Sequence, residues 1–141
     1  MEWPKTRGWR GWAWAGALAG LIVFASGRSE VASPRLLGFD KVAHFALFGL
    51  LATLVLRNGV GRGWAWATVA LVSLFGAADE WHQSFTVGRT VQLADWVADT
   101  LGAAVAVAGY TGWPWYRRLL EGELKRRVEQ PAAMPPNRRA A

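Results

Sequence analysis

The chain has 141 residues, enough for one domain, and 52% of them are hydrophobic while 18% are charged, which is more apolar than a water-soluble domain of this size needs. The net charge of +6 comes from basic residues at the ends of apolar segments, which argues against a nucleic-acid-binding protein. The absence of cysteine excludes disulfide bonds, thiolate nucleophiles and sulfur ligands to a metal.

Four apolar segments approach the length of about 20 residues that a membrane-spanning helix needs. Tryptophans cluster near the predicted ends of these segments, as is typical of the interface between membrane and water. We therefore predict an all-α, polytopic membrane protein, a four-transmembrane-helix bundle formed by residues 1–115. The predicted helices cover approximately residues 9–25, 42–57, 63–83 and 93–115.

The first segment also resembles a signal peptide, because basic residues precede a short apolar region that ends in Val23-Phe24-Ala25. We favour an uncleaved helix. The spacing of Gly16 and Gly20 offers a face on which another helix can pack closely. Cleavage would leave the topology of the other three segments unchanged.

Residues 116–141 are predicted to form a basic cytoplasmic tail that is partly disordered. Its beginning, from Leu119 to Val128, has the spacing of a short amphipathic helix that can lie on the inner leaflet. The prolines after Gln130 indicate disorder.

Lysine and arginine counts predict the orientation of the bundle. The two ends and the second connection together hold twelve of these residues, while the first and third connections hold four. Because basic residues accumulate on the cytoplasmic side, we predict a multi-pass protein of the bacterial cytoplasmic membrane with both termini in the cytoplasm. Its expected partner is the lipid bilayer, and the oligomeric state is left open.

Ionisable residues concentrate at the ends of three predicted helices on the outer side. Spacings of three or four residues place each set on one helix face, so the three sets are expected to converge inside the bundle. Gly102, seven residues after Asp95, continues one of these faces and can admit a neighbouring helix. The polar residues singled out here are Asp40, Lys41, His44, Asp79, Glu80, Gln83, Arg89, Asp95 and Asp99.

The order and spacing of these residues resemble the signature of the VanZ-like family over residues 39–105. The matching elements are Asp40-Lys41-x-x-His44-Phe45, then Glu80-x-x-Gln83-x-Phe85-x-x-Gly88-Arg89, then Asp95 and Gly102. This chain has Gln92 and Asp99 where family members often have Asp and Asn. The resemblance implies a small bacterial membrane protein of the cell envelope, associated with resistance to the glycopeptide teicoplanin, which acts outside the membrane.

Several functions fit this cluster. In a binding site for a lipid-linked or cell-wall precursor, Arg89, Lys41 and Gln83 would hold a phosphate or carboxylate, with Asp40, Asp95 and Asp99 beside them. In an enzyme, His44 or Glu80 would act as general acid or base. A metal site would use His44, Glu80, Asp95 and Asp99, but no compact ligand motif is present, so no metal is predicted.

Two further alternatives stay open. The carboxylates and histidines can relay a proton or cation in a small transporter, although the cytoplasmic half lacks ionisable residues to complete a path. The cluster can also be purely structural, with Lys41 and Arg89 pairing carboxylates to hold helix ends together. Five carboxylates exceed two fixed cations by three, and this excess requires protonation, a histidine cation, a bound metal or a cationic ligand.

Overall fold

The computed structural model describes residues 8–28, 39–87 and 89–121. All the secondary-structure elements of its described part are helices, which confirms the predicted all-α class. A short 3-10 helix, η1, precedes α3. The helices are α1 (Gly8–Ser26), α2 (Phe39–Leu56), η1 (Arg62–Trp64), α3 (Ala65–Gln83), α4 (Leu93–Gly112) and α5 (Pro114–Glu121).

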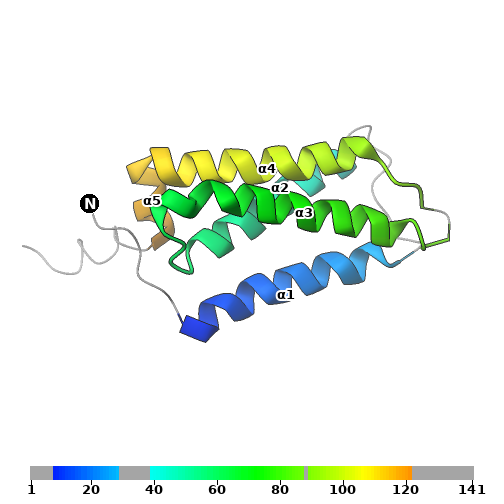
Figure 1. Ribbon diagram of the computed structural model, residues 1–141, viewed down its shortest axis with the longest axis horizontal. Helices are drawn as coiled ribbons and strands as arrows, with labels where there is room; N and C mark the ends of the chain where they lie inside the picture. Colours follow the sequence, from blue (N-terminus) through cyan, green and yellow to red (C-terminus); the bar gives the residue numbers. More distant parts are fainter. Residues whose placement is uncertain (1–7, 29–38, 88, 122–141) are drawn as a thin grey trace, which may run out of the picture.

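The four long helices lie side by side and alternate in direction, with α5 crossing one end of the bundle (Figure 1). Because of this alternation, the last turns of α1 and α3 lie at the same end as the first turns of α2 and α4. This end is opposite α5, and it is called the polar end below. It carries the ionisable residues that the sequence singles out.

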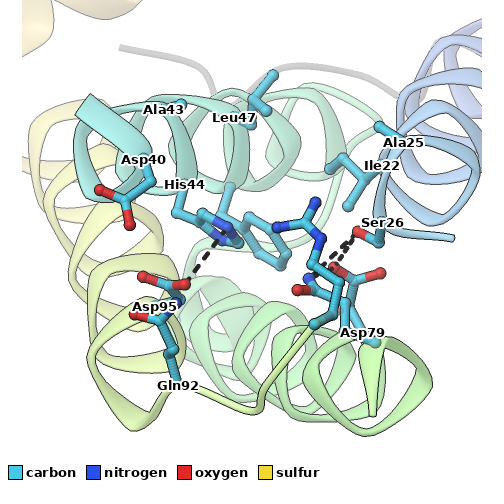
Figure 2. Close-up of a pocket in the computed structure, with 13 residues that line it drawn as sticks. Ile22, Ala25, Ser26, Asp40, Ala43, His44, Leu47, Asp79, Gln92 and Asp95 are labelled. Carbon is cyan, nitrogen blue, oxygen red and sulfur yellow. Dashed lines mark hydrogen bonds and ion pairs between the residues drawn. The ribbon is translucent and has the colours of Figure 1, made fainter. Parts of the chain in front are cut away.

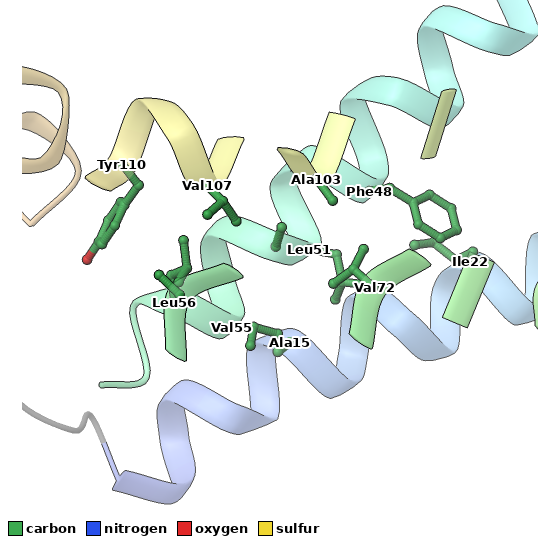
Figure 3. Close-up of a cluster of buried hydrophobic side chains, with 12 residues drawn as sticks. Ala15, Ile22, Phe48, Leu51, Val55, Leu56, Val72, Ala103, Val107 and Tyr110 are labelled. Atoms are coloured by element: carbon green, nitrogen blue, oxygen red, sulfur yellow. The ribbon is translucent and has the colours of Figure 1, made fainter. Parts of the chain in front are cut away.

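Apolar side chains from all four long helices fill the centre of the bundle (Figure 3). On α2 the buried positions recur at intervals of three or four residues, which is the spacing of one helix face. The buried apolar residues are Ala15, Ile22, Phe48, Leu51, Ala52, Val55, Leu56, Ala65, Val72, Ala103, Val107 and Tyr110.

Small residues let α2 and α4 approach each other closely. A Cβ atom placed on Gly102 would collide with the carbonyl group of Phe45, and one placed on Gly49 would lie 3.1 Å from the carbonyl oxygen of Gly102. The close approach expected at Gly102 is therefore present, and its neighbour is the backbone of α2.

The fourth long helix ends at Gly112, before the predicted end at residue 115. Trp113 has extended backbone angles, as is common for a residue before proline, and Pro114 starts α5. Glu121 fixes α5 to the bundle, because its Oε1 accepts hydrogen bonds from Arg57 Nε at 3.1 Å and from the Tyr110 hydroxyl at 2.8 Å. The predicted tail thus begins in a packed helix.

The rest of the tail, residues 122–141, lies outside the described residues, and so does most of the amphipathic helix predicted there. Within the described ranges, none of the helices has both the length and the hydropathy needed to cross a membrane.

Candidate functional site

A cavity of about 150 Å³ opens at the polar end, and all four long helices contribute side chains to it (Figure 2). Its wall combines apolar residues from α1 and α2 with polar residues from every long helix. The lining residues are Ile22, Ala25, Ser26, Asp40, Ala43, His44, Leu47, Phe48, Asp79, Gln83, Arg89, Gln92 and Asp95.

Lys41 joins the first turns of α2 and α4. Its Nζ donates hydrogen bonds to Asp40 Oδ2 and Asp95 Oδ1, both at 2.8 Å, and to Gln92 Oε1 at 3.2 Å. Asp95 is buried, whereas Lys41 is partly exposed. Because these three acceptors occupy its ammonium group, Lys41 serves as a link between helices, and the expected role of Lys41 in holding a ligand's anionic group is not favoured.

His44, one turn further along α2, is held by Asp99. The ring Nδ1 lies 2.9 Å from Asp99 Oδ1, and Asp99 is fully buried. An ionised carboxylate only accepts hydrogen bonds, so Nδ1 is the donor when Asp99 is ionised. The other ring nitrogen, Nε2, lies 4.0 Å from Asp95 Oδ2 and is left for a ligand or a proton.

Asp79 near the end of α3 is held by neutral donors. Ser26 Oγ donates a hydrogen bond to its Oδ2 at 2.6 Å, and Gln83 Nε2 donates another at 3.1 Å. The Gln83 amide also lies 3.3 Å from Ser26 Oγ. These buried contacts connect the last turn of α1 to α3, a link that the sequence analysis did not predict.

Glu80, on the next position of α3, faces the start of α4. Its Oε2 accepts a hydrogen bond from the backbone N–H of Gln92 at 2.8 Å, and its side chain is buried. This bond satisfies a backbone donor just before α4, where the first N–H groups of a helix have no partner within the helix. Glu80 thereby fixes the connection that carries Arg89.

Arg89 lines the cavity from the α3–α4 connection and is partly buried. Within the described ranges it makes no ion pair and no side-chain hydrogen bond. A purely structural cluster, as considered from the sequence, would have Arg89 paired with a carboxylate, and the described residues show no such pair. A guanidinium group has five N–H donors, which suit a phosphate or carboxylate.

Three buried carboxylates at the polar end each have one oxygen without a hydrogen-bond partner among the described residues: Asp79 Oδ1, Glu80 Oε1 and Asp99 Oδ2. In addition, His44, Glu80 and Asp95 each bring one ligand atom to within 4.8 Å of the others. The site therefore offers one guanidinium donor group and several oxygen acceptors.

The structure thus brings all eight predicted site residues to one end of the bundle. Five of them line the cavity: Asp40, His44, Gln83, Arg89 and Asp95. Of the other three, Lys41 and Glu80 hold its wall and Asp99 orients His44. The unpredicted Ser26 also lines the cavity. Sequence reasoning missed Ser26 and Gln92 as parts of the site. Ser26 is uncharged and belongs to no repeated polar spacing, so no sequence signal marked it, whereas Gln92 was noted only as the residue that stands where family members often have Asp.

The chain belongs to the VanZ/LLP1 family, because the family model matches residues 8–115. This match contains the four long helices and every residue of the site. No curated protein and no solved structure matches the chain.

Proposed function

We propose that this VanZ/LLP1-family chain is a bacterial cell-envelope membrane protein whose cavity binds the polar head group of a lipid-linked or cell-wall molecule. Through this binding it lowers susceptibility to glycopeptides such as teicoplanin. The observation that carries the proposal is the cavity itself, in which Arg89, without an acidic partner among the described residues, lies in the same wall as Asp79, whose Oδ1 has no hydrogen-bond partner there.

The wall favours a head group with two kinds of polar atom. Arg89 can donate to a phosphate or carboxylate, while Asp79 and Asp95 can accept hydrogen bonds from hydroxyl or ammonium groups. A glycosyl phosphate has both an anionic group and hydroxyl donors. The cavity volume of about 150 Å³ admits one such small unit and not a whole antibiotic, because drug-sized ligands fill about 300–1,000 Å³.

Membrane placement is supported by the outward faces of the helices. Soluble monomers rarely expose large contiguous apolar patches, and a bilayer would cover such surfaces. The polar residues that lower the hydropathy of α3 and α4, such as Glu80 and Asp99, are buried inside the bundle. Large apolar side chains that are about half exposed or more include Leu21, Phe24, Leu50, Leu71, Leu74, Leu101 and Val105.

The outer side is proposed for the polar end because of the distribution of basic residues. Twelve of the sixteen lysine and arginine residues belong to the termini and the second connection, and four belong to the first and third connections. Basic residues accumulate on the cytoplasmic side of a membrane. A cavity on the outer side would meet cell-wall precursors after they have crossed the membrane.

Transport is less well supported than binding. Within the described ranges, α2 has no ionisable side chain between His44 and Arg57, and α4 has none between Asp99 and Tyr110. A path for a proton or cation would need polar or ionisable side chains through that part of the bundle. A purely structural role explains Lys41, but it leaves Arg89 without an ion pair in the described part.

Binding can be tested with the purified full-length chain in detergent, using a polyprenyl phosphate and the matching polyprenol as probes. Arg89→Ala is expected to weaken phosphate binding about 10–100-fold, since a charge-assisted hydrogen bond contributes about 1.5–3 kcal/mol. Arg62→Ala, at the exposed start of η1, is the control. Equal binding of both probes, or an equal loss in the control, would contradict the proposal.

A further inference from the structure

We propose that His44, Glu80 and Asp95 form a binding site for one divalent transition-metal ion, Zn²⁺ or Mn²⁺, with Asp99 orienting the histidine. The inference goes beyond head-group binding and stands independently of it, because its evidence is the arrangement of the four side chains alone. It also revises the sequence-based prediction that no metal is bound.

The three ligand atoms already lie close together. One atom each from His44, Glu80 and Asp95 lies within 4.8 Å of the other two. Two oxygen or nitrogen ligands of one Zn²⁺ ion, each about 2.1 Å from it, are at most about 4.2 Å apart. Small side-chain movements toward a common centre therefore complete the site.

Asp99 supplies the second contact that metal-binding histidines need. It lies 2.9 Å from His44 Nδ1, so with Asp99 ionised and the ring neutral this nitrogen is the donor and Nε2 carries the free lone pair. In protein metal sites, the ring N–H opposite the metal is commonly bonded to a carboxylate in this way. The bond also fixes the plane of the ring.

Glu80 gives independent support for a ligand. The side chain is 4% exposed, yet its Oε1 has no hydrogen-bond partner within the described ranges. A buried carboxylate oxygen without a partner is costly, and buried charges are usually paired or bound to a metal. Its Oε2 is held by the backbone N–H of Gln92, which fixes the carboxylate beside the proposed ion.

Charge balance favours a dication at the same place. Lys41 is the cation paired with Asp95, and it binds Oδ1, which leaves Oδ2 facing the histidine at 4.0 Å. Glu80 has no ion pair in the described part of the chain. A dication would compensate Glu80 and Asp99, and three protein ligands leave a coordination position open toward the cavity.

The ligand set indicates the class of metal. Imidazole nitrogen with two carboxylates suits zinc and also accepts manganese, whereas calcium takes six to eight oxygen ligands. We therefore expect Zn²⁺ or Mn²⁺ to bind in preference to Ca²⁺.

Metal binding can be measured on the full-length chain in detergent after treatment with a chelator and dialysis against Zn²⁺, Mn²⁺ or Ca²⁺. We expect about one Zn²⁺ or Mn²⁺ per chain, a higher thermal midpoint with the ion, and no bound Ca²⁺. Glu80→Gln should lower the affinity at least about 10-fold, and Asp99→Asn about 10–100-fold. His82→Gln, which changes an exposed histidine outside the cavity, should leave the affinity unchanged.

Wild-type protein that binds neither Zn²⁺ nor Mn²⁺ would overturn the proposal without reference to any variant. Equal loss of binding in His82→Gln and Glu80→Gln would also overturn it, because the ion would then be held at the surface. Circular dichroism on each variant checks that the helices are intact. Head-group binding by a wild-type protein that binds neither Zn²⁺ nor Mn²⁺ would leave the proposed function standing while the metal site fails.

Discussion

Asp99 lies 2.9 Å from Nδ1 of His44 and thereby turns the opposite nitrogen, Nε2, toward Asp95. The two residues come from α4 and α2, so their bond depends on the close packing of these helices. Asp99 itself is fully buried. The relationship links the fold to the site, because a shift between the two helices would release the histidine ring.

The hydrogen bond predicts the tautomer of His44. In its neutral form the ring should carry the proton on Nδ1, since an ionised Asp99 can only accept. Nitrogen NMR of the ring resolves the two tautomers. His82→Gln leaves His44 as the sole histidine of the chain and simplifies the spectrum. A proton on Nε2 in the neutral form would show that Nδ1 does not donate a hydrogen bond to Asp99.

Gly102→Ala should destabilise the bundle. The added Cβ would collide with the carbonyl group of Phe45, so α2 and α4 would have to separate. Overpacking of this kind reduces the free energy of unfolding by about 1–3 kcal/mol. Thermal unfolding in detergent, followed by circular dichroism, measures the change.

Gly109→Ala on the same helix is the matched control. A Cβ there would meet only the ring of Tyr116, at an ordinary contact distance of 3.7 Å. Since alanine favours a helix over glycine by about 0.5–1 kcal/mol, this variant should be neutral or slightly more stable. Equal destabilisation by both substitutions would mean that the close approach at Gly102 does not matter.

Ser26→Ala should weaken the docking of α1. The Ser26 hydroxyl donates to the buried carboxylate of Asp79 at 2.6 Å, and its loss should lower the free energy of unfolding by about 1.5–3 kcal/mol. Ser84→Ala is the control, because the Ser84 hydroxyl is exposed and bonds only to the carbonyl of Trp81. A similar effect of both changes would argue against a special role for the Ser26–Asp79 contact.

The proposed topology predicts opposite behaviour of two reporter fusions. A reporter fused after Gln130 should indicate a cytoplasmic location, whereas one fused after Arg28 should indicate an extracytoplasmic location. Both fusions can be read with a phosphatase and a fluorescent protein in parallel. An extracytoplasmic reporter after Gln130 would reverse the orientation and move the cavity to the inner side.

Much of the site was predictable because short-range spacing determines which residues share a helix face. Asp95 and Asp99 are four residues apart, and both point into the bundle. The alternating direction of four helices then brings the polar ends together. The role of Gly102 was predictable for the same reason, because it continues the face of Asp95.

Other features depend on contacts between residues distant in the sequence, which spacing does not specify. Ser26 and Asp79 are 53 positions apart, and a single serine at the end of a helix does not indicate that it has a buried partner. Lys41 has several carboxylates within reach, so its choice of Asp40 and Asp95 emerged only from the packing. The fixing of α5 by Glu121 depends likewise on Tyr110 in α4 and on Arg57, the residue directly after α2.

Glycopeptide susceptibility in a host that expresses the chain tests most directly whether the cavity is the functional site. Wild type, Arg89→Ala and the control Arg62→Ala should be compared at equal membrane abundance and with thermal stability measured for each. We predict that wild type and Arg62→Ala protect the host against teicoplanin, and that a stable, abundant Arg89→Ala variant does not. Protection by Arg89→Ala equal to that of wild type would contradict the account, because the cavity would then serve only to hold the helices together.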